Sequence, residues 1–97
     1  MRFEWNPVKD RLNLDKHRIS FDTASLVFQD PRALSIQDRT VEGEERWQTQ
    51  GMVGGVVILV AHTYREQGSD EVIRIISARK ATPQERKVYE EGIEQTS

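Results

Sequence analysis

The stretch GGVVILVAHTYR, residues 54–65, is the most apolar part of the chain and decides its fold. Gly54 and Gly55 favour a two-residue hairpin turn, because both central positions of such a turn require positive φ. The apolar run that follows predicts a strand over Val56 to Arg65, paired with a strand predicted over Arg46 to Val53. This run is much too short to cross a bilayer. The stretch therefore predicts the centre of a sheet in a soluble domain.

Further strands are predicted on both sides of this hairpin. They cover Ala33 to Gln37 and Val72 to Lys80, and a short edge strand covers Phe3 to Trp5. Strands so closely spaced along the chain favour an antiparallel meander, since short connections join antiparallel neighbours.

Capping residues mark the start of three predicted helices. Asn6 and Ser20 are good N-caps, and Thr82-Pro83-Gln84-Glu85 combines a capping box with proline at the first helical position. The helices run from Pro7 to about His17 (with Val8 and Leu12 on one side), from Phe21 to Phe28, and from Pro83 toward Ile93, the last with a weak apolar stripe that predicts loose docking. The predicted order is β-α-α-β-β-β-β-α. We expect a single compact α+β domain over residues 1–97, with an antiparallel sheet and the two N-terminal helices on one face.

Charge is unevenly distributed along the 97 residues, whose formal net charge is -2. Residues 1–18 carry five basic and three acidic side chains and residues 72–87 carry five and one, whereas 19–71 carry four and nine and 88–97 carry three glutamates. This pattern predicts a surface with a basic side for a polyanion and an acidic side for a basic partner. With no cysteine, disulfides, thiolate nucleophiles and cysteine zinc sites are excluded. The N-terminus lacks a signal peptide, so we expect a cytoplasmic protein without membrane contact.

Several motifs along the chain together resemble one known family. They are Phe3-Glu4-Trp5-Asn6-Pro7 with Lys9, Asn13, Lys16-His17 and Ser20-Phe21, then Glu45-Arg46-Trp47, the Val57 to His62 strand, and Arg74 to Thr82 with Glu85-Arg86 and Tyr89. The chain resembles the BrnT toxins of bacterial type II toxin–antitoxin modules over about Phe3 to Gly92. The resemblance implies a RelE-like ribonuclease domain that cleaves RNA and arrests growth. It also implies neutralisation by a BrnA antitoxin with a DNA-binding ribbon-helix-helix, so that DNA is reached only through the antitoxin.

Two positions depart from the pattern of that family. Asn6 stands where Asp is usual, which an N-cap tolerates because both side chains accept the capping hydrogen bond. Arg18 replaces a usual glycine just after the first helix, where a left-handed backbone is favoured, and so alters the surroundings of His17.

Cleavage of RNA needs few protein groups, because the 2'-hydroxyl is the nucleophile. A base, an acid and cations around the phosphate are sufficient. We assign catalysis to His62, as base or acid, and to Arg79 and Arg74, and substrate binding to Lys9, Lys16, His17 and Lys80. Against these roles, His62 could simply pack at a strand end, the arginines could pair with the loop Glu42 to Glu45, and the lysines could be solvated. No metal or cofactor is expected, because the two histidines are far apart in sequence and no metal-binding motif appears.

A second class of function stays open beside this metal-independent endoribonuclease. The chain could be a non-catalytic, toxin-derived module that acts as co-repressor with a DNA-binding antitoxin, using its acidic middle segment and the Glu-rich end of its last helix. If the chain is the endoribonuclease, we expect the antitoxin to occlude Arg79 or to shift the last helix. Trp5 and Trp47 are expected to pack in the core. A bulge near Ser77 would decide which charged residues of the last strand share a face.

Overall fold

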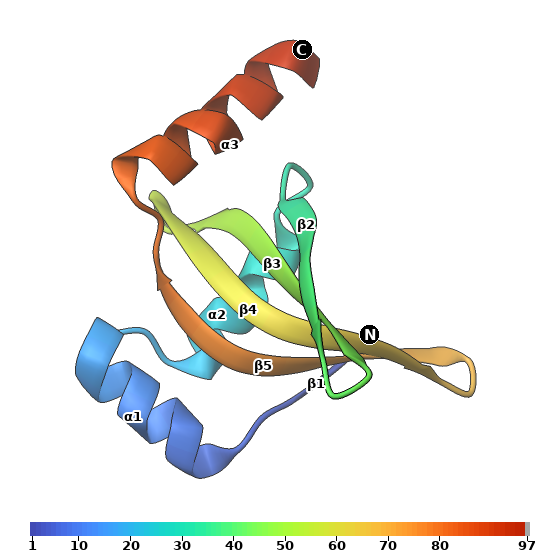
Figure 1. Cartoon of the computed structure of the whole chain (residues 1–97). Coiled ribbons are helices and arrows are strands. Elements are labelled where there is room, and N and C mark those ends of the chain that lie inside the picture. Colours follow the sequence, from blue (N-terminus) through green and yellow to red (C-terminus); the bar gives the residue numbers. More distant parts are fainter. Residues whose placement is uncertain (97) are drawn as a thin grey trace.

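The sheet of the computed structural model, which describes residues 1–96 and side chains through Gly92, is mixed and has the order β1-β5-β4-β3-β2. The strands are β1 (Arg2–Glu4), β2 (Leu34–Val41), β3 (Glu44–Val53), β4 (Val56–Gln67) and β5 (Asp70–Lys80). The predicted turn at Gly54 and Gly55 is confirmed, with φ of 57° and 82°. The prediction of a wholly antiparallel sheet was wrong, because β1 pairs parallel to β5. Two helices separate β1 from the meander, so no hairpin sets its direction (Figure 1).

The helices begin at the residues that the capping signals predict. Within the described residues they are α1 (Pro7–His17), α2 (Phe21–Ser25), the 3-10 turn η1 (Leu26–Gln29) and α3 (Pro83–Thr96). Asn6 Oδ1 accepts from the N–H of Val8 at 2.8 Å and of Lys9 at 3.2 Å. The single helix predicted over Phe21 to Phe28 is instead one α-helical turn followed by η1. Glu94, part of the predicted Glu-rich helix end, lies outside the side chains that the structure describes. No helix within residues 1–96 is long and apolar enough to span a membrane.

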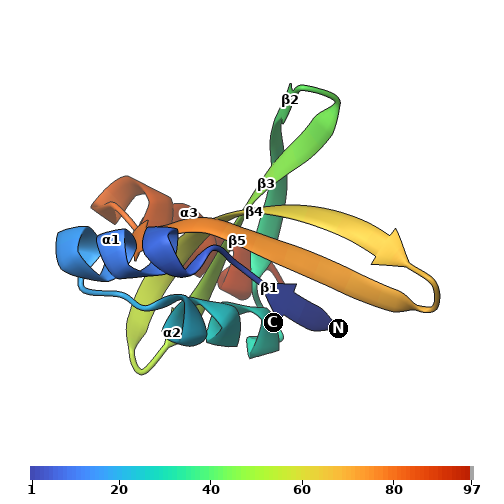
Figure 2. The same cartoon turned by 90° about the horizontal axis from the view of Figure 1, so that it is seen from below.

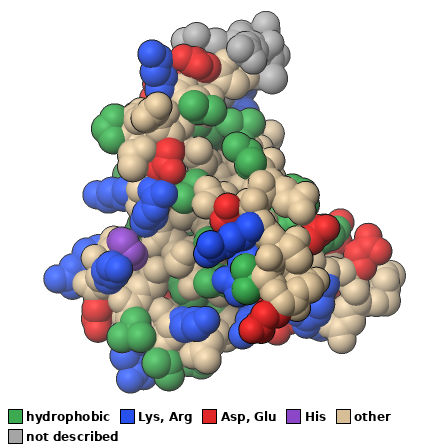
Figure 3. All heavy atoms as spheres, viewed as in Figure 1, with side chains coloured by type: hydrophobic (Ala, Val, Ile, Leu, Met, Phe, Trp, Pro, Cys, Tyr) green, Lys and Arg blue, Asp and Glu red, His purple; other side chains and the backbone are tan. Residues whose placement is uncertain are grey.

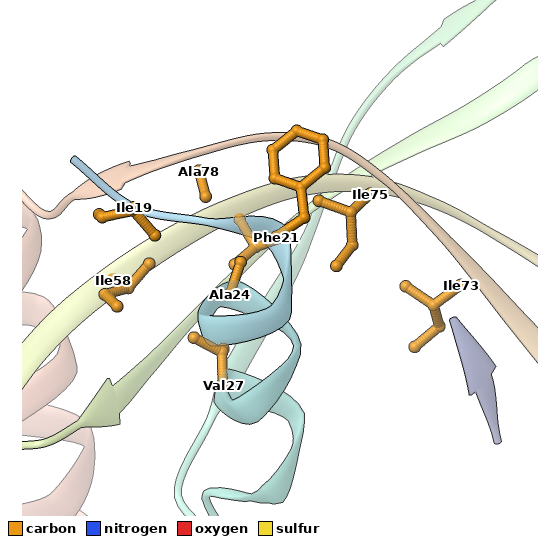
Figure 4. Packing of buried hydrophobic residues seen from close by; sticks show 9 residues of the cluster. Ile19, Phe21, Ala24, Val27, Ile58, Ile73, Ile75 and Ala78 are labelled. Carbon is orange, nitrogen blue, oxygen red and sulfur yellow. The ribbon is translucent and has the colours of Figure 1, made fainter. Parts of the chain in front are cut away.

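The core fills the space between α2 with η1 and one face of the sheet, here called the helix face (Figure 4). Its members come from both layers: Ile19, Phe21, Ala24, Val27, Ile58, Val60, Ile73, Ile75 and Ala78. Gly51 allows the close approach, because a Cβ there would lie 2.7 Å from Val27 Cγ1. Trp5 packs edge-on against Phe21, which confirms its predicted place in the core.

Helix α1 does not cover the sheet face as predicted. Val8 and Leu12 are 62% and 61% exposed, so its apolar side chains do not hold it. Strand β1 pairs with β5 only as far as Glu4, which lies opposite Arg74. Helix α1 lies along the edge of β5 that is free beyond this point (Figure 2). The buried amide of Asn13 joins α1 to this edge. A polar contact at a strand edge therefore replaces the expected apolar stripe.

Helix α3 stands at one end of the sheet (Figure 1). Among its described side chains Tyr89 is buried, and its hydroxyl donates to Asp30. Burial, reinforced by the adjacent Asp30 carboxylate, raises the pKa of Tyr89 to about 12. Val88, the residue before it, is half exposed. Through Gly92, the described side chains of α3 therefore offer one buried aromatic residue rather than a continuous apolar stripe.

Candidate functional site

A β-bulge at Ile76 decides which charged residues of β5 share a face. Ser77 pairs with Ala61 and Ile75 with His62, so Ile76 is an extra residue without a partner on β4. Beyond the bulge, Arg79 lies opposite Leu59, whereas before it Arg74 lies opposite Thr63. Because Leu59 and Thr63 are an even number of residues apart, Arg74 and Arg79 share one face of the sheet. We call it the arginine face.

His62 lies on the other side of the sheet from these arginines. It precedes Thr63 on β4, so its side chain belongs to the helix face, where its ring meets Phe28 edge-on at 4.9 Å between centroids. His62 Nε2 lies 2.7 Å from Thr49 Oγ1, which is in turn 2.8 Å from Ser35 Oγ. Burial lowers the pKa of His62, which favours the neutral imidazole. The sheet therefore separates His62 from Arg74 and Arg79.

Three of the predicted substrate-binding residues are brought together on α1. Lys9, Lys16 and His17 line a hollow of about 240 Å³ whose floor includes Asn13, Ile76 and Ser77. Lysines seven residues apart share a helix face, and the bulge places the backbone of β5 beside them. Figure 3 shows Lys and Arg side chains gathered over α1 and the neighbouring edge of the sheet. The hollow joins cationic side chains and a half-buried imidazole in one place.

Arg79 is engaged by an ion pair that the sequence did not predict. Its two terminal nitrogens donate to Glu85 Oε1 at 2.7 Å and Oε2 at 3.0 Å. The partner is thus on the first turn of α3 and not in the loop Glu42 to Glu45. The Arg79 hydrogen bonds lower the pKa of Glu85 to about 2. Among the described side chains, Arg74, Lys9, Lys16 and Lys80 make no ion pair.

Comparison with known protein families shows which family this chain belongs to. The family described as "Ribonuclease toxin, BrnT, of type II toxin-antitoxin system" matches residues 5–85, most of the chain. The chain belongs to the BrnT family. No curated protein matches it at a significant level. The chain is therefore a member of a family of ribonuclease toxins that work with an antitoxin.

Arg46 of this BrnT chain belongs to the arginine face, a position that was not predicted from the sequence. Arg46, on β3, lies opposite Thr63 of β4. Arg74, on β5, lies opposite the same threonine, so Arg46 and Arg74 share the arginine face. The Nε of Arg46 is buried without a hydrogen-bond partner among the described residues. The signal was available, because Arg46 stands inside the Glu45-Arg46-Trp47 motif, but its face depends on the register of β3 against β4.

Proposed function

We propose that this BrnT chain is a metal-independent endoribonuclease with a RelE-like fold that cleaves bacterial RNA in the cytoplasm. Its antitoxin would be a BrnA-like ribbon-helix-helix protein. The observation that carries the proposal is the hollow of Lys9, Lys16 and His17 beside the bulge of β5, in a chain of a ribonuclease-toxin family. Cations and an imidazole around one hollow are the groups that cleavage of RNA requires.

The proposed reaction uses the RNA as its own nucleophile. His17 removes the proton of the 2'-hydroxyl, whose oxygen attacks the neighbouring phosphorus. The bond from phosphorus to the 5' oxygen breaks, giving a 2',3'-cyclic phosphate, and the departing oxygen takes up a proton from solvent, to which the protonated His17 then returns the one it removed. Lys9 and Lys16 stabilise the charge on the phosphate oxygens. Arg74 and Arg79, on the arginine face, bind flanking phosphates along β5; Lys80, opposite Ile58, lies on the helix face instead and takes no part in this contact.

The two histidines compete for the role in proton transfer. His62 was the first candidate, but it is 4% exposed and its pKa is lowered by burial. His17 is half buried and lines the hollow with the lysines. A catalytic base must lie within hydrogen-bond reach of the substrate, so the geometry favours His17. His62→Gln is the variant that tests the assignment of catalysis to His62 made from the sequence.

The decisive experiment incubates the purified chain with fluorescently labelled RNA in EDTA. We expect cleavage that His17→Ala reduces about a hundredfold, the usual contribution of a proton-transfer residue. Lys9→Ala/Lys16→Ala should reduce it by about the same factor, because the charges that stabilise the phosphate oxygens are lost. Lys87→Ala on α3 is the matched control and should leave the rate unchanged. Intact RNA in EDTA together with cleavage in Mg²⁺ would contradict the metal-independent mechanism.

The co-repressor function remains the second candidate, favoured by the engagement of Arg79 with Glu85. An antitoxin that shifts α3 would alter this ion pair. A chain that binds its antitoxin tightly but leaves RNA intact under all metal conditions would support the co-repressor.

A further inference from the structure

An apolar pocket opens on the helix face, beyond the edge of η1. Its volume is about 280 Å³, and its walls include Phe28, Trp47, His62, Tyr64 and Ile73. These residues come from η1 and from three strands, β3, β4 and β5. Figure 2 shows the β2–β3 hairpin and the β4–β5 hairpin extending in different directions from the common sheet. Trp47 is only half buried here, which corrects its predicted place in the core.

Carboxylates continue this face beyond the pocket. Glu66 lies directly opposite Glu71 in the β4–β5 hairpin, and both share the face of Tyr64 and Ile73, two residues nearer the pocket. Burial, together with the carboxylates of Glu71 and Glu66, raises the pKa of Tyr64. On β3, Glu45 shares the face of Trp47. Carboxylates of two hairpins thus lie on the same face as the apolar walls of the pocket.

The pair of Glu66 and Glu71 is unfavourable for the isolated chain. Like charges directly opposite each other on neighbouring strands destabilise a hairpin. Among the described residues, no cationic side chain pairs with Glu45, Glu66 or Glu71. A cation brought by a partner would relieve this repulsion, and an apolar side chain beside it would fill the pocket.

We propose that the pocket docks a basic segment of the antitoxin, with an apolar side chain seated against Trp47 and Tyr64. Lysines or arginines of the segment pair with Glu45, Glu66 and Glu71. The occupant follows from charge complementarity. The ammonium of Met1, which also lines the pocket, is already paired with Asp70, so the carboxylates leave this face acidic, and the basic surface lies at α1. This inference rests on the antitoxin implied by the family. It does not depend on RNA cleavage, because the pocket shares no lining residue with the hollow of Lys9, Lys16 and His17.

The test measures binding of short fluorescein-labelled peptides by anisotropy. One peptide has a central leucine flanked by lysines and arginines, the second has alanine for the leucine, and the third has glutamates for the basic residues. We expect the first to bind about tenfold more tightly than either of the others, the effect of losing one anchor or one set of charges. Equal binding of the leucine and alanine peptides would overturn the proposal.

Two variants locate the binding and separate it from folding. Glu66→Lys should weaken binding about tenfold, yet raise the Tm, because it replaces a like-charge pair with an opposite-charge pair across the strands. Tyr64→Ala should weaken binding of the leucine peptide but not of the alanine peptide. Glu91→Lys on α3 makes the same change in net charge at a distance and is the control.

The results distinguish this inference from the proposed function. If Glu66→Lys and Glu91→Lys weaken binding equally, attraction by net charge explains it and the pocket is not the site. If both cleave RNA like the parent while only Glu66→Lys loses the peptide, the docking surface stands apart from the RNA surface. If the chain binds the peptide at the pocket but leaves RNA intact, the proposed ribonuclease function is wrong and the docking inference stands.

Discussion

The side chain of Asn13 pairs with the backbone of Ala78 as a neighbouring strand would. Its Nδ2 donates to the Ala78 carbonyl at 2.8 Å, and its Oδ1 accepts from the Ala78 N–H at 3.0 Å. The same Nδ2 donates to the carbonyl of Ile19 at 2.9 Å. One buried amide therefore completes the free edge of β5 and fixes the helix that carries Lys9, Lys16 and His17.

Asn13→Ala should lower the free energy of unfolding by about 2–4 kcal/mol, because three buried backbone groups lose their partners. Urea denaturation measures the loss. Asn6→Asp is the control, since the N-cap keeps its acceptor and stability should change by less than about 0.5 kcal/mol. A cost for Asn13→Ala as small as that of the control would show that water replaces the amide.

Arg18→Gly should stabilise the chain by about 0.5–1 kcal/mol. Arg18 has φ of 61°, the left-handed conformation that the sequence analysis expected at this position. Glycine adopts this conformation without the clash of a Cβ. Thermal denaturation measures the change, and Arg18→Ala separates charge from backbone because alanine keeps the Cβ. Equal Tm values for the glycine and alanine variants would remove strain as the cause.

The Arg79–Glu85 pair should make stability depend on acid pH. Arg79 lowers the pKa of Glu85 to about 2 in the folded chain, from an ordinary value of 4.5. The unfolded chain therefore binds the proton first, so the contribution is present above pH 4.5 and is lost as the pH falls toward 2. Glu85→Gln should cost about 1 kcal/mol at neutral pH, because the pair is partly exposed, and should flatten the acid limb of the stability curve. Glu90→Gln in the exposed pair with Arg86 is the control and should leave the acid limb as it is.

Lys9→Ala/Lys16→Ala should reduce the salt dependence of RNA binding. If each lysine neutralises one phosphate, the slope of log K against log salt should fall in magnitude by about 1.4, twice the value for one contact on a single strand. Anisotropy titrations at several salt concentrations measure it. Lys87→Ala should leave the slope unchanged; a slope unaltered in the double variant would place the RNA elsewhere.

Much of the fold follows from local signals in the sequence. The glycine turn and the capping residues Asn6 and Ser20 act over a few residues, so the hairpin and the helix starts were predicted within a residue or two. The direction of β1 depends on where two intervening helices deliver the chain. The position of α1 depends on Asn13 reaching Ala78, 65 residues away in sequence. No local pattern encodes such contacts.

The candidate site was predicted in part for the same reason. Lys9, Lys16 and His17 lie on one helix, so their spacing is enough to bring them together. His62, Arg74 and Arg79 depend on alternation along two paired strands, and one bulge residue changes the face of everything beyond it. Arg79 also meets Glu85, because the capping box at Thr82 turns the carboxylate back toward the strand end.

The bulge at Ile76 also limits how the length of β5 can vary in evolution. Deleting Ile76 would restore a regular ladder with β4 and leave Arg79 opposite Leu59, whereas a strand of the present length without the bulge would place Arg79 opposite Ile58, which is 3% exposed in the core. A guanidinium cannot be buried in that space without a partner. A change in the length of β5 should therefore be tolerated only where it keeps Arg79 opposite Leu59, and we expect related chains to conserve this register even where their side chains differ.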